Sequence, residues 1–343
     1  MASPQAAPDA LPPHAQLVQM GTAHWVSHLV YAAADLGLAD LLAQGPKTAD
    51  ELAGSTKTHA PTLYRFLRTL ASLGLFSEDS GHRFALTPLG EALKTGAPGA
   101  ARSSILTLGS EWVYRSFQEM TYSLQTGKPG FDKAMGVPIF DWLAKHPREA
   151  SMFSETMIGF HGAEPAAVSA AYSFAGMKTI IDVGGATGHL LTTVLSRNPG
   201  ATGILYDLPH VVKDAPALIK SQGLTDRVTI ESGSFFDQVP AGGDAYLLSH
   251  IIHDWSEAQC LTILGNCRRA MKPDGRVLII EMVLPPGNAP HPGKMLDMMM
   301  LVGPGGQERT EQEYAALLGK AKFRLARVVP TASAVSVVEA LPA

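Results

Sequence analysis

Short β-rich runs alternate with helical segments through the C-terminal half of this 343-residue chain, and this alternation constrains the fold most. It predicts an α/β architecture, in which helices cover both faces of a parallel sheet. Ligands of such sheets bind at the carboxyl ends of the strands. Strands are expected at 179–183, 203–206, 228–231, 245–249 and 277–280, and helices near 190–197, 211–220 and 256–271.

The first part of the chain predicts a different architecture. Apolar residues recur at helical spacing over 14–42, and Thr48 is of the type that caps the short helix after it. A further helix over 62–70 precedes a hairpin with strands at 74–76 and 83–86. Helices followed by a small hairpin are the plan of a winged helix.

These patterns divide the chain into four segments. We expect a loose tail over 1–13, a mostly helical winged-helix domain over 14–100, a helical linker and pocket region over 101–174, and the α/β domain over 175–343. Aromatic and methionine side chains of the middle segments form core or line an apolar pocket, and both alternatives stay open. The candidates for a pocket that binds the substrate are Trp112, Met157, Phe160, Met295, Met298 and Met299.

The charge balance argues against nucleic acid and anionic membranes as partners. Lys and Arg number 27 and Asp and Glu 31, so the net charge is −4. A winged helix can bind DNA, and its second helix carries Arg65 and Arg68. Because these are only two positive charges in a negatively charged chain, a structural role for the winged helix is favoured over DNA binding.

The chain shows no sign of export or membrane insertion. Residues 1–13 contain no Lys or Arg and no apolar core, so we do not expect them to form a signal peptide. The longest apolar runs are short, and Asp297 interrupts a Met-rich one. Cys260 and Cys267 provide neither a disulfide framework nor a zinc site, and we expect both to be buried on one helix face. A reduced, cytoplasmic compartment fits these features.

A glycine-rich turn follows the first predicted strand of the α/β domain. Residues 184–188 read Gly-Gly-Ala-Thr-Gly and precede a helix, whose first N–H groups are free to bind a ligand. Asp207 ends the second strand, 19 residues after Gly188. In nucleotide-binding α/β folds, an acid at this position binds ribose hydroxyls.

The turn fits S-adenosylmethionine better than a dinucleotide. The dinucleotide fingerprint requires glycine at the sixth position from Gly184, where this chain has His189. Asp182 places a carboxylate just before the turn, and that charge would repel a pyrophosphate but attract an ammonium group. Because no lysine follows the turn, a P-loop is excluded.

Two histidines and two glutamates lie where the same crevice is expected. His250 and His253 follow the fourth strand, and His253 is placed for proton transfer, whereas His250 is expected to pack or to form a wall of the cofactor site. Glu281 ends the fifth strand, and Glu308 follows the flexible loop 303–306. Together the two carboxylates can orient a histidine and stabilise its charge.

Five motifs in this order resemble the S-adenosylmethionine-dependent O-methyltransferases of the caffeic acid, acetylserotonin and hydroxyneurosporene type. Bacterial members of this family act on polyketides, phenazines and carotenoids in secondary metabolism. The resemblance covers nearly the whole chain, including the winged helix. The motifs lie at 182–188, 206–212, 253–257, 272–281 and 305–310.

The resemblance implies a Rossmann-like class I methyltransferase domain and an N-terminal dimerisation domain. Family members are homodimers, in which the N-terminal helices intertwine and close the substrate pocket of the partner. The catalytic base of the family corresponds to His253, flanked by Glu281 and Glu308. The expected S-adenosylmethionine-binding residues are Asp182, Gly184, Gly185, Gly188, Asp207, Leu208, Ser234, Phe235, Ser249, His250 and Trp255.

Three positions depart from the family pattern. Ser234 stands where plant members carry an acid that contacts adenosine, so a hydroxyl replaces a charged hydrogen-bonding group. Ser249 stands in place of a lysine, and Ala186 in place of the third glycine of the turn. These changes concern the details and the strength of cofactor binding.

The predicted reaction is methylation of a hydroxyl, typically phenolic, on an aromatic or polyketide-like small molecule. Proton transfer from a phenol with a pKa near 10 to a histidine with a pKa near 6.5 is uphill by about 5 kcal/mol. Carboxylates beside His253 would raise its pKa and reduce this cost. Asp254 is expected to be structural, and no metal site is expected.

Several alternatives stay open. N-methylation is one of them, because an amine can dispense with a base. Non-methylating chemistry on the same scaffold, such as hydroxylation, decarboxylation or pericyclic reaction, is another. The last is a winged-helix DNA-binding protein that senses a metabolite.

Overall fold

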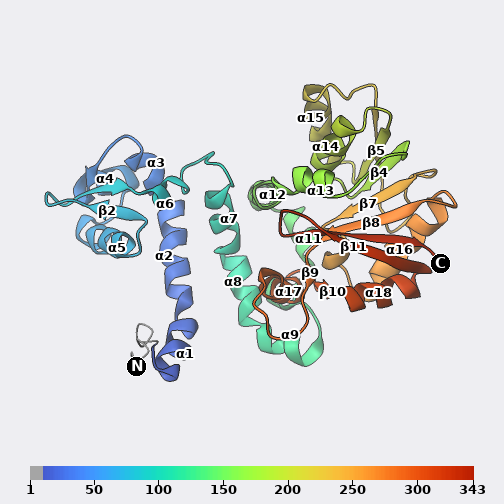
Figure 1. The fold of residues 1–343 in the computed structure, drawn as a ribbon. Coiled ribbons are helices and arrows are strands. Elements are labelled where there is room, and N and C mark those ends of the chain that lie inside the picture. Colours follow the sequence, from blue (N-terminus) through green and yellow to red (C-terminus); the bar gives the residue numbers. More distant parts are fainter. Residues whose placement is uncertain (1–10) are drawn as a thin grey trace, which may run out of the picture. The chain divides into compact units, whose positions relative to one another are not determined.

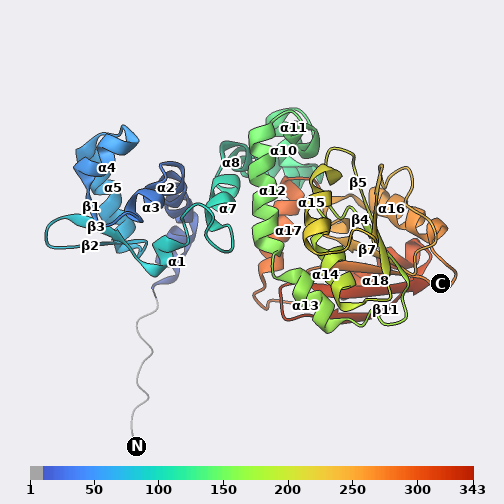
Figure 2. The same cartoon turned by 90° about the horizontal axis from the view of Figure 1, so that it is seen from above.

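The computed structural model describes residues 11–343 and divides into two compact units (Figures 1 and 2). The helical unit comprises 11–114 and 146–160, and the sheet unit comprises 115–145 and 161–343. Helices α8 (Glu111–Gln118) and α12 (Pro147–His161) each contribute residues to both units. No helix within residues 11–343 has the length and apolar character needed to cross a lipid bilayer.

The helical unit has the predicted winged-helix elements. The hairpin is confirmed, and a third short strand joins it to make a sheet of order β1-β3-β2. The helix expected over 14–42 is divided into three, with Gly37 in the left-handed conformation at one break. The elements are α1 (Pro13–Gly21), α2 (Ala23–Asp35), α3 (Leu38–Leu42), β1 (Lys47–Thr48), α4 (Ala49–Thr56), α5 (Ala60–Ser72), β2 (Phe76–Glu78), β3 (Arg83–Leu86), α6 (Pro88–Glu91) and α7 (Ala101–Leu108).

Local chemistry explains where these helices begin. Thr48 caps α4 as predicted: its hydroxyl accepts from the N–H of Glu51, whose carboxylate accepts from the N–H of Thr48. Helices α3, α4 and α5 and the hairpin enclose a core that includes Leu52, Leu67 and Phe84. By contrast, α1 buries no residue, and the apolar side chains of α1 and α2 include several exposed ones: Leu17, Val18, Met20, Trp25 and Val26.

The sheet unit contains a seven-stranded sheet of order β11-β12-β8-β7-β4-β5-β6. The five predicted strands are confirmed and run parallel. The sequence did not predict β11 and β12, which form an antiparallel hairpin that pairs with β8 and makes the sheet mixed. The strands are β4 (Thr179–Val183), β5 (Thr202–Asp207), β6 (Val228–Ser232), β7 (Ala245–Ser249), β8 (Arg276–Glu281), β11 (Phe323–Pro330) and β12 (Ser336–Pro342).

Alternate residues of the central strands face opposite layers of helices. Ile180 packs with α13, α14 and α15 on one face, and Ile181 packs with α16 and α18 on the other. The helix predicted over 211–220 is divided into a 3₁₀ turn, η1 (Val212–Asp214), and α15. The helices are α9 (Met120–Thr126), α10 (Gly130–Met135), α11 (Ile139–Leu143), α13 (Glu164–Ala171), α14 (His189–Arg197), α15 (Ala215–Ser221), α16 (Glu257–Ala270), α17 (Pro292–Val302) and α18 (Glu311–Lys320).

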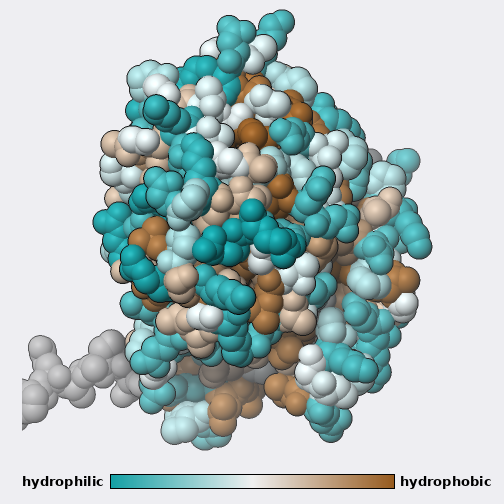
Figure 3. All heavy atoms as spheres, turned by 90° about the vertical axis from the view of Figure 1, so that its right-hand side faces the viewer, coloured by the Kyte–Doolittle hydropathy of each residue, from teal (hydrophilic) through white to brown (hydrophobic). Residues whose placement is uncertain are grey.

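Cys260 and Cys267 are fully buried on the inner face of α16 and are not disulfide-bonded, as predicted. The outer surface on this side of the molecule carries mainly hydrophilic side chains, with hydrophobic ones in small groups (Figure 3). Scattered apolar residues of this kind are normal for a protein surface.

The order of the strands places the ligand crevice. Strands β4, β5 and β6 extend the sheet in one direction, whereas β7 and β8 extend it in the other. The order therefore reverses between β4 and β7, which are direct neighbours. A crevice forms outside the carboxyl ends of strands at such a switch point. The glycine-rich turn after β4 and the histidines after β7 both lie there.

We expect Gly90→Ala to destabilise the helical unit by about 1–3 kcal/mol, because a Cβ at Gly90 would lie 2.2 Å from the carbonyl oxygen of Leu75. Gly54→Ala is the matched control. A Cβ there meets nothing within 4 Å, and alanine in this exposed helix is expected to stabilise by about 0.5–1 kcal/mol. Chemical denaturation measures both effects, and equal midpoints would contradict this packing.

Candidate active site

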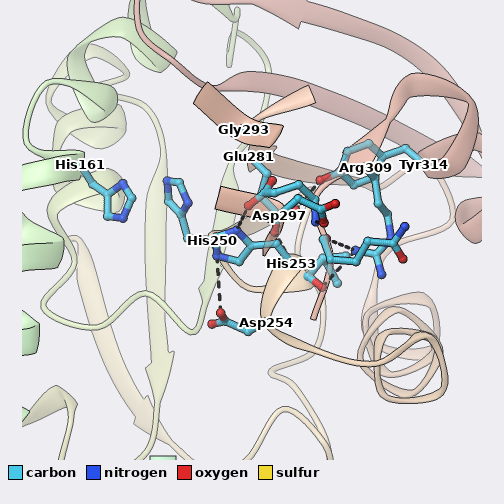
Figure 4. Close-up of polar contacts among 12 residues, drawn as sticks. His161, His250, His253, Asp254, Glu281, Gly293, Asp297, Arg309 and Tyr314 are labelled. Carbon is cyan, nitrogen blue, oxygen red and sulfur yellow. Dashed lines mark hydrogen bonds and ion pairs between the residues drawn. The ribbon is translucent and has the colours of Figure 1, made fainter. Parts of the chain in front are cut away.

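The centre of the site is a buried histidine at the end of a central strand. A 3₁₀ turn, η2 (Ile252–Asp254), follows β7 and carries His253, which is 7% exposed. Its Nδ1–H donates to Glu308 Oε1 over 2.6 Å, and its main-chain N–H donates to Glu281 Oε1 over 3.1 Å. Figure 4 shows His253 among Asp254, Glu281 and Asp297. The structure therefore brings together the three residues predicted to be catalytic.

A short pair of strands places the two glutamates. Strand β9 (Val283–Leu284) pairs in parallel with β10 (Arg309–Thr310), and Arg309 lies opposite Val283. Glu281 lies two residues before β9, and Glu308 comes directly before β10. The pairing therefore joins two segments that are far apart in the sequence, and both carboxylates reach His253.

The glycine-rich loop before Glu308 approaches the backbone of His253 closely. The N–H of Gln307 donates to the carbonyl oxygen of His253 over 2.8 Å. A Cβ at Gly306 would lie 1.8 Å from that same oxygen. Only glycine allows this approach, and the approach brings Glu308 within hydrogen-bond distance of the imidazole.

Sequence reasoning missed three side chains that hold this group in place. Asp297 Oδ1 accepts from the N–H of Glu308 over 2.9 Å, and the Tyr314 hydroxyl donates to Glu281. The buried Arg309 guanidinium donates to the carbonyl oxygen of Ile252 over 3.3 Å and adds positive charge beside the carboxylates. A lone acid in the apolar, Met-rich helix α17 was the signal available for Asp297.

The carboxylates set the charge of His253. Burial by itself lowers the pKa of His253, but Asp254, the hydrogen bond to Glu308 and the charge of Glu281 outweigh burial and raise this pKa to about 10. Burial raises the pKa of Asp254 to about 6. The distance from His253 Nε2 to Asp254 Oδ1 is 3.7 Å, too long for a hydrogen bond. Nε2 is therefore the nitrogen available to a ligand.

Two positions of the turn after β4 have little space for a side chain. Gly184 has a φ of +73°, and a Cβ there would lie 2.3 Å from the Ile251 side chain. A Cβ at Gly185 would lie 2.5 Å from the carboxyl carbon of Asp182. Ala186 adopts a φ of +49°, so it occupies a conformation that glycine adopts more readily.

Asp207 connects the turn to the next strand. Its Oδ2 accepts from the N–H of Ala186 over 3.0 Å, and its Oδ1 accepts from the N–H of Leu208 over 2.7 Å. Burial raises the pKa of Asp207, and these two hydrogen bonds oppose the rise. Each carboxylate oxygen retains a second lone pair for a ligand.

Asp182 is a buried carboxyl that has no side-chain partner among the described residues, and only the main chain of Leu191 lies close enough to lower its pKa. Burial, followed by the negative charge of Asp207, raises its pKa to about 7. An unpaired acid in this position fits a cationic ligand group, which would restore the charged form. The residues present therefore fit the cationic amino-acid end of S-adenosylmethionine.

Aromatic side chains border the same turn. The rings of Phe235 and Trp255 lie edge to face with centroids 5.9 Å apart, and Phe235 reaches within 3.5 Å of the Cβ position of Gly184. Ser234, in the loop after β6, accepts from the N–H of Phe236 over 3.2 Å. Ser249 is the last residue of β7.

The predicted substrate residues fall in both units. Trp112, Met157 and Phe160 belong to the helical unit, where Trp112 is buried and Phe160 is 51% exposed. Helix α17 of the sheet unit carries the three methionines, of which Met295 is 73% exposed and the other two are half-buried: Met295, Met298 and Met299. Because Asp297 of the same helix contacts Glu308, α17 lies against the catalytic group.

A second cluster adjoins His253 and was not predicted as a group. Glu164 Oε2 lies 2.7 Å from His250 Nε2 and 3.0 Å from His161 Nδ1. Within residues 11–343, these three side chains are the one group whose possible metal-ligating atoms lie within 4.8 Å of one another. In this arrangement, hydrogen bonds to the carboxylate occupy one nitrogen of each imidazole. That this site needs no metal stays a prediction.

Comparison with known proteins assigns the family. Residues 117–324 match the O-methyltransferase domain, and residues 18–96 match the O-methyltransferase dimerisation domain. The chain belongs to the S-adenosylmethionine-dependent O-methyltransferases, and the second match supports a homodimer. The exposed apolar side chains of α1 and α2 lie mainly within that dimerisation segment.

Similar proteins have been characterised and solved. The chain is 44% identical to the phenazine O-methyltransferase PhzM of Lysobacter antibioticus over 97% of both chains. The crystal structure of LaPhzM superposes with a TM-score of 0.90 at 44% identity and covers 97% of this chain and all of its own. NcsB1, an O-methyltransferase from neocarzinostatin biosynthesis, was solved with S-adenosylmethionine and 2-hydroxy-5-methyl naphthoic acid. It has a TM-score of 0.84 and 31% identity, and covers 98% of this chain and all of its own.

Without cofactor, we expect Asp182→Asn to gain stability relative to the wild type as the pH rises. The folded-state pKa of Asp182, about 7, exceeds its unfolded value, so the wild type loses stability between about pH 4 and 7. The variant should therefore gain about 2–3 kcal/mol over the wild type between pH 5 and 8. Denaturation at both pH values measures this, with the exposed Asp226→Asn as control. A gain that does not change with pH would contradict the raised pKa.

Proposed function

We propose that the protein transfers the methyl group of S-adenosylmethionine to a phenolic hydroxyl of a planar aromatic small molecule, with His253 as the general base. One observation carries this proposal: His253 Nδ1 is held by Glu308 at 2.6 Å, which leaves Nε2 available to a ligand. A histidine bound in this way resembles the base of other hydrolytic and transfer enzymes, where a carboxylate fixes the ring and its tautomer.

The raised pKa of His253 suits a phenol. Once its imidazole is neutral, a histidine with a pKa of about 10 exchanges a proton with a phenol at little free-energy cost, whereas an ordinary histidine would face about 5 kcal/mol. Glu281 and Glu308 stabilise the imidazolium that results. S-adenosylmethionine, when bound, supplies a methyl group whose leaving group is a neutral thioether.

The cofactor would lie across the carboxyl ends of β4, β5 and β7. Asp182 would face its ammonium group, Asp207 its ribose, and the main chain at Gly184 would approach it closely. The remaining proposed contacts are Gly185, Gly188, Leu208, Ser234, Phe235, Ser249, His250 and Trp255. The unpartnered carboxyl of Asp182 and the steric need for glycine in the turn support this placement.

The acceptor is proposed to be polycyclic. The similar proteins named above act on a phenazine and bind a naphthoic acid, both of which are flat aromatic molecules. Methionines 298 and 299 of α17 offer flexible apolar surface to such a ring. A cytoplasmic location is also proposed, since two unpaired buried cysteines fit a reducing compartment.

Two observations weigh against the alternatives. His253, Glu281 and Glu308 form one hydrogen-bonded group, which non-methylating chemistry would not require. The net charge of −4 does not favour DNA binding. N-methylation stays open and is resolved by identifying the methylated atom in the product.

We expect His253→Ala and His253→Gln to lose at least about 100-fold in turnover, because a general base contributes about 10²–10⁴-fold. Affinity for S-adenosylhomocysteine, measured by calorimetry, should stay within about threefold of wild type. The assay follows a labelled methyl group into a panel of phenols that includes hydroxyphenazines. A variant with near wild-type turnover would refute His253 as the base.

The dependence of kcat/KM on pH should show the effect of Glu308 on the pKa of His253. Since the unprotonated His253 is the active form and its pKa is raised, kcat/KM should increase with pH above 6.5. Glu308→Gln removes a negative partner, so this increase should shift to lower pH by about 1–2 units while the maximal rate falls. Exposed Glu257→Gln, which loses only an ion pair with Lys320, is the control. An unshifted profile would exclude control by Glu308.

A further inference from the structure

His161 and Glu164 have no part in the reaction described above, yet the group that they form with His250 adjoins the base. The imidazole centroids of His161 and His250 are 3.7 Å apart, and those of His250 and His253 are 5.2 Å apart. Figure 4 shows the three histidines in a row, with His250 between the others. His250 is therefore the side chain through which this group meets the catalytic centre.

Glu164 determines which nitrogen of His250 carries the proton. Burial would raise the pKa of Glu164, but the hydrogen bonds from His161 and His250 outweigh it and lower the pKa to about 2. The carboxylate is therefore ionised and can only accept hydrogen bonds. His250 Nε2, 2.7 Å from Glu164 Oε2, must be the donor.

The other nitrogen of His250 is consequently a hydrogen-bond acceptor. Burial lowers the pKa of His250 more than Glu164 raises it, so the ring is neutral at pH 7. With the proton on Nε2, the Nδ1 atom carries the lone pair. Nδ1 is buried and has no hydrogen-bond partner among the described residues. A buried acceptor without a donor costs folding free energy, so such an atom in a native structure indicates that a ligand or another partner binds there.

The backbone holds His250 in this position. Its φ is +53°, a left-handed conformation that residues other than glycine rarely adopt. Its N–H donates to the carbonyl oxygen of Ile280 over 3.1 Å, so it continues the pairing of β7 with β8. Such conformations persist where surrounding structure enforces them, and they concentrate at ligand sites.

We propose that His250 Nδ1 accepts a hydrogen bond from a second O–H or N–H group of the methyl acceptor, and that the enzyme selects acceptors carrying such a donor near the methylated hydroxyl. The inference rests on the proposed function, since it requires that the acceptor hydroxyl meets His253. The two imidazoles are close enough for two substituents of one aromatic molecule to reach both. Catechol-type and ortho-amino-hydroxy aromatics are the matching class.

The donor belongs to the acceptor rather than to the cofactor. The unpaired oxygens of Asp182 already offer partners to the cofactor's ammonium group. His250 instead lies beside His253, whose Nε2 faces the reacting hydroxyl. The ring of His250 can still border the cofactor site, while its Nδ1 accepts a hydrogen bond from the methyl acceptor.

The test compares matched acceptors in the complex with S-adenosylhomocysteine, where no turnover occurs. Calorimetry gives the Kd of naphthalene-2,3-diol and of 3-methoxy-2-naphthol, and of the corresponding pair of phenazines. The wild type should bind the diols at least about tenfold more tightly. His250→Leu should reduce this preference to within about twofold. His250→Gln should retain much of it, because the amide can donate to Glu164 and still accept from the ligand.

Several outcomes would overturn the inference. These are a wild type that does not prefer the diols, or a His250→Leu variant that keeps the preference while its thermal melting shows it folded. A third is a more than tenfold loss of S-adenosylhomocysteine affinity in His250→Leu with the preference unchanged, since the donor would then be on the cofactor. A separate turnover assay distinguishes the two proposals. If the wild type prefers the diols but transfers no methyl group, the proposed function is wrong. If it transfers the methyl group without preferring the diols, this inference is wrong.

Discussion

The hydrogen bond between His253 and Glu308 is the interaction on which the active site depends. It joins two side chains 55 positions apart, in a buried environment where an isolated charge would be costly. Other features serve it: Gly306 permits the close approach, Asp297 holds the main chain of Glu308, and β9–β10 pairing fixes both glutamate-bearing segments. The same carboxylates raise the pKa of His253 toward that of a phenol, so the geometry and the proton chemistry have one origin.

The sheet supplies the other half of the site. Because the strand order reverses between β4 and β7, the glycine-rich turn and the histidine segment meet at one crevice. Asp182 lies at the carboxyl end of β4, buried and unpaired, and this arrangement costs stability unless a cation is bound. His250 shows a similar arrangement, with an unpaired Nδ1 and a left-handed backbone. Both positions are costly to stability, and both are the places where ligand recognition is proposed.

Sequence reasoning succeeded where the signal is local. The alternation of β-rich runs with helical segments identified five strands, and the turn at 184–188 and the His253 motif were recognised from short segments. It missed the β11–β12 hairpin, so the antiparallel edge of the sheet was not expected. It also missed Asp297 and Tyr314, because a single acid or tyrosine in a helix does not show which distant residue it contacts. Glu164 was missed for the same reason: its partner His250 is 86 positions away.

By itself, the sequence determined the five parallel strands of the α/β domain, the glycine-rich turn after the first of them, and the family, because these depend on residue type and short spacing. Only the tertiary structure decided the protonation of the site. Whether His253 is strongly basic, Asp182 holds a proton or His250 presents a lone pair depends on burial and on which charges come within a few ångströms. Those distances are set by strand order and by contacts between remote segments, which no local pattern in the chain records.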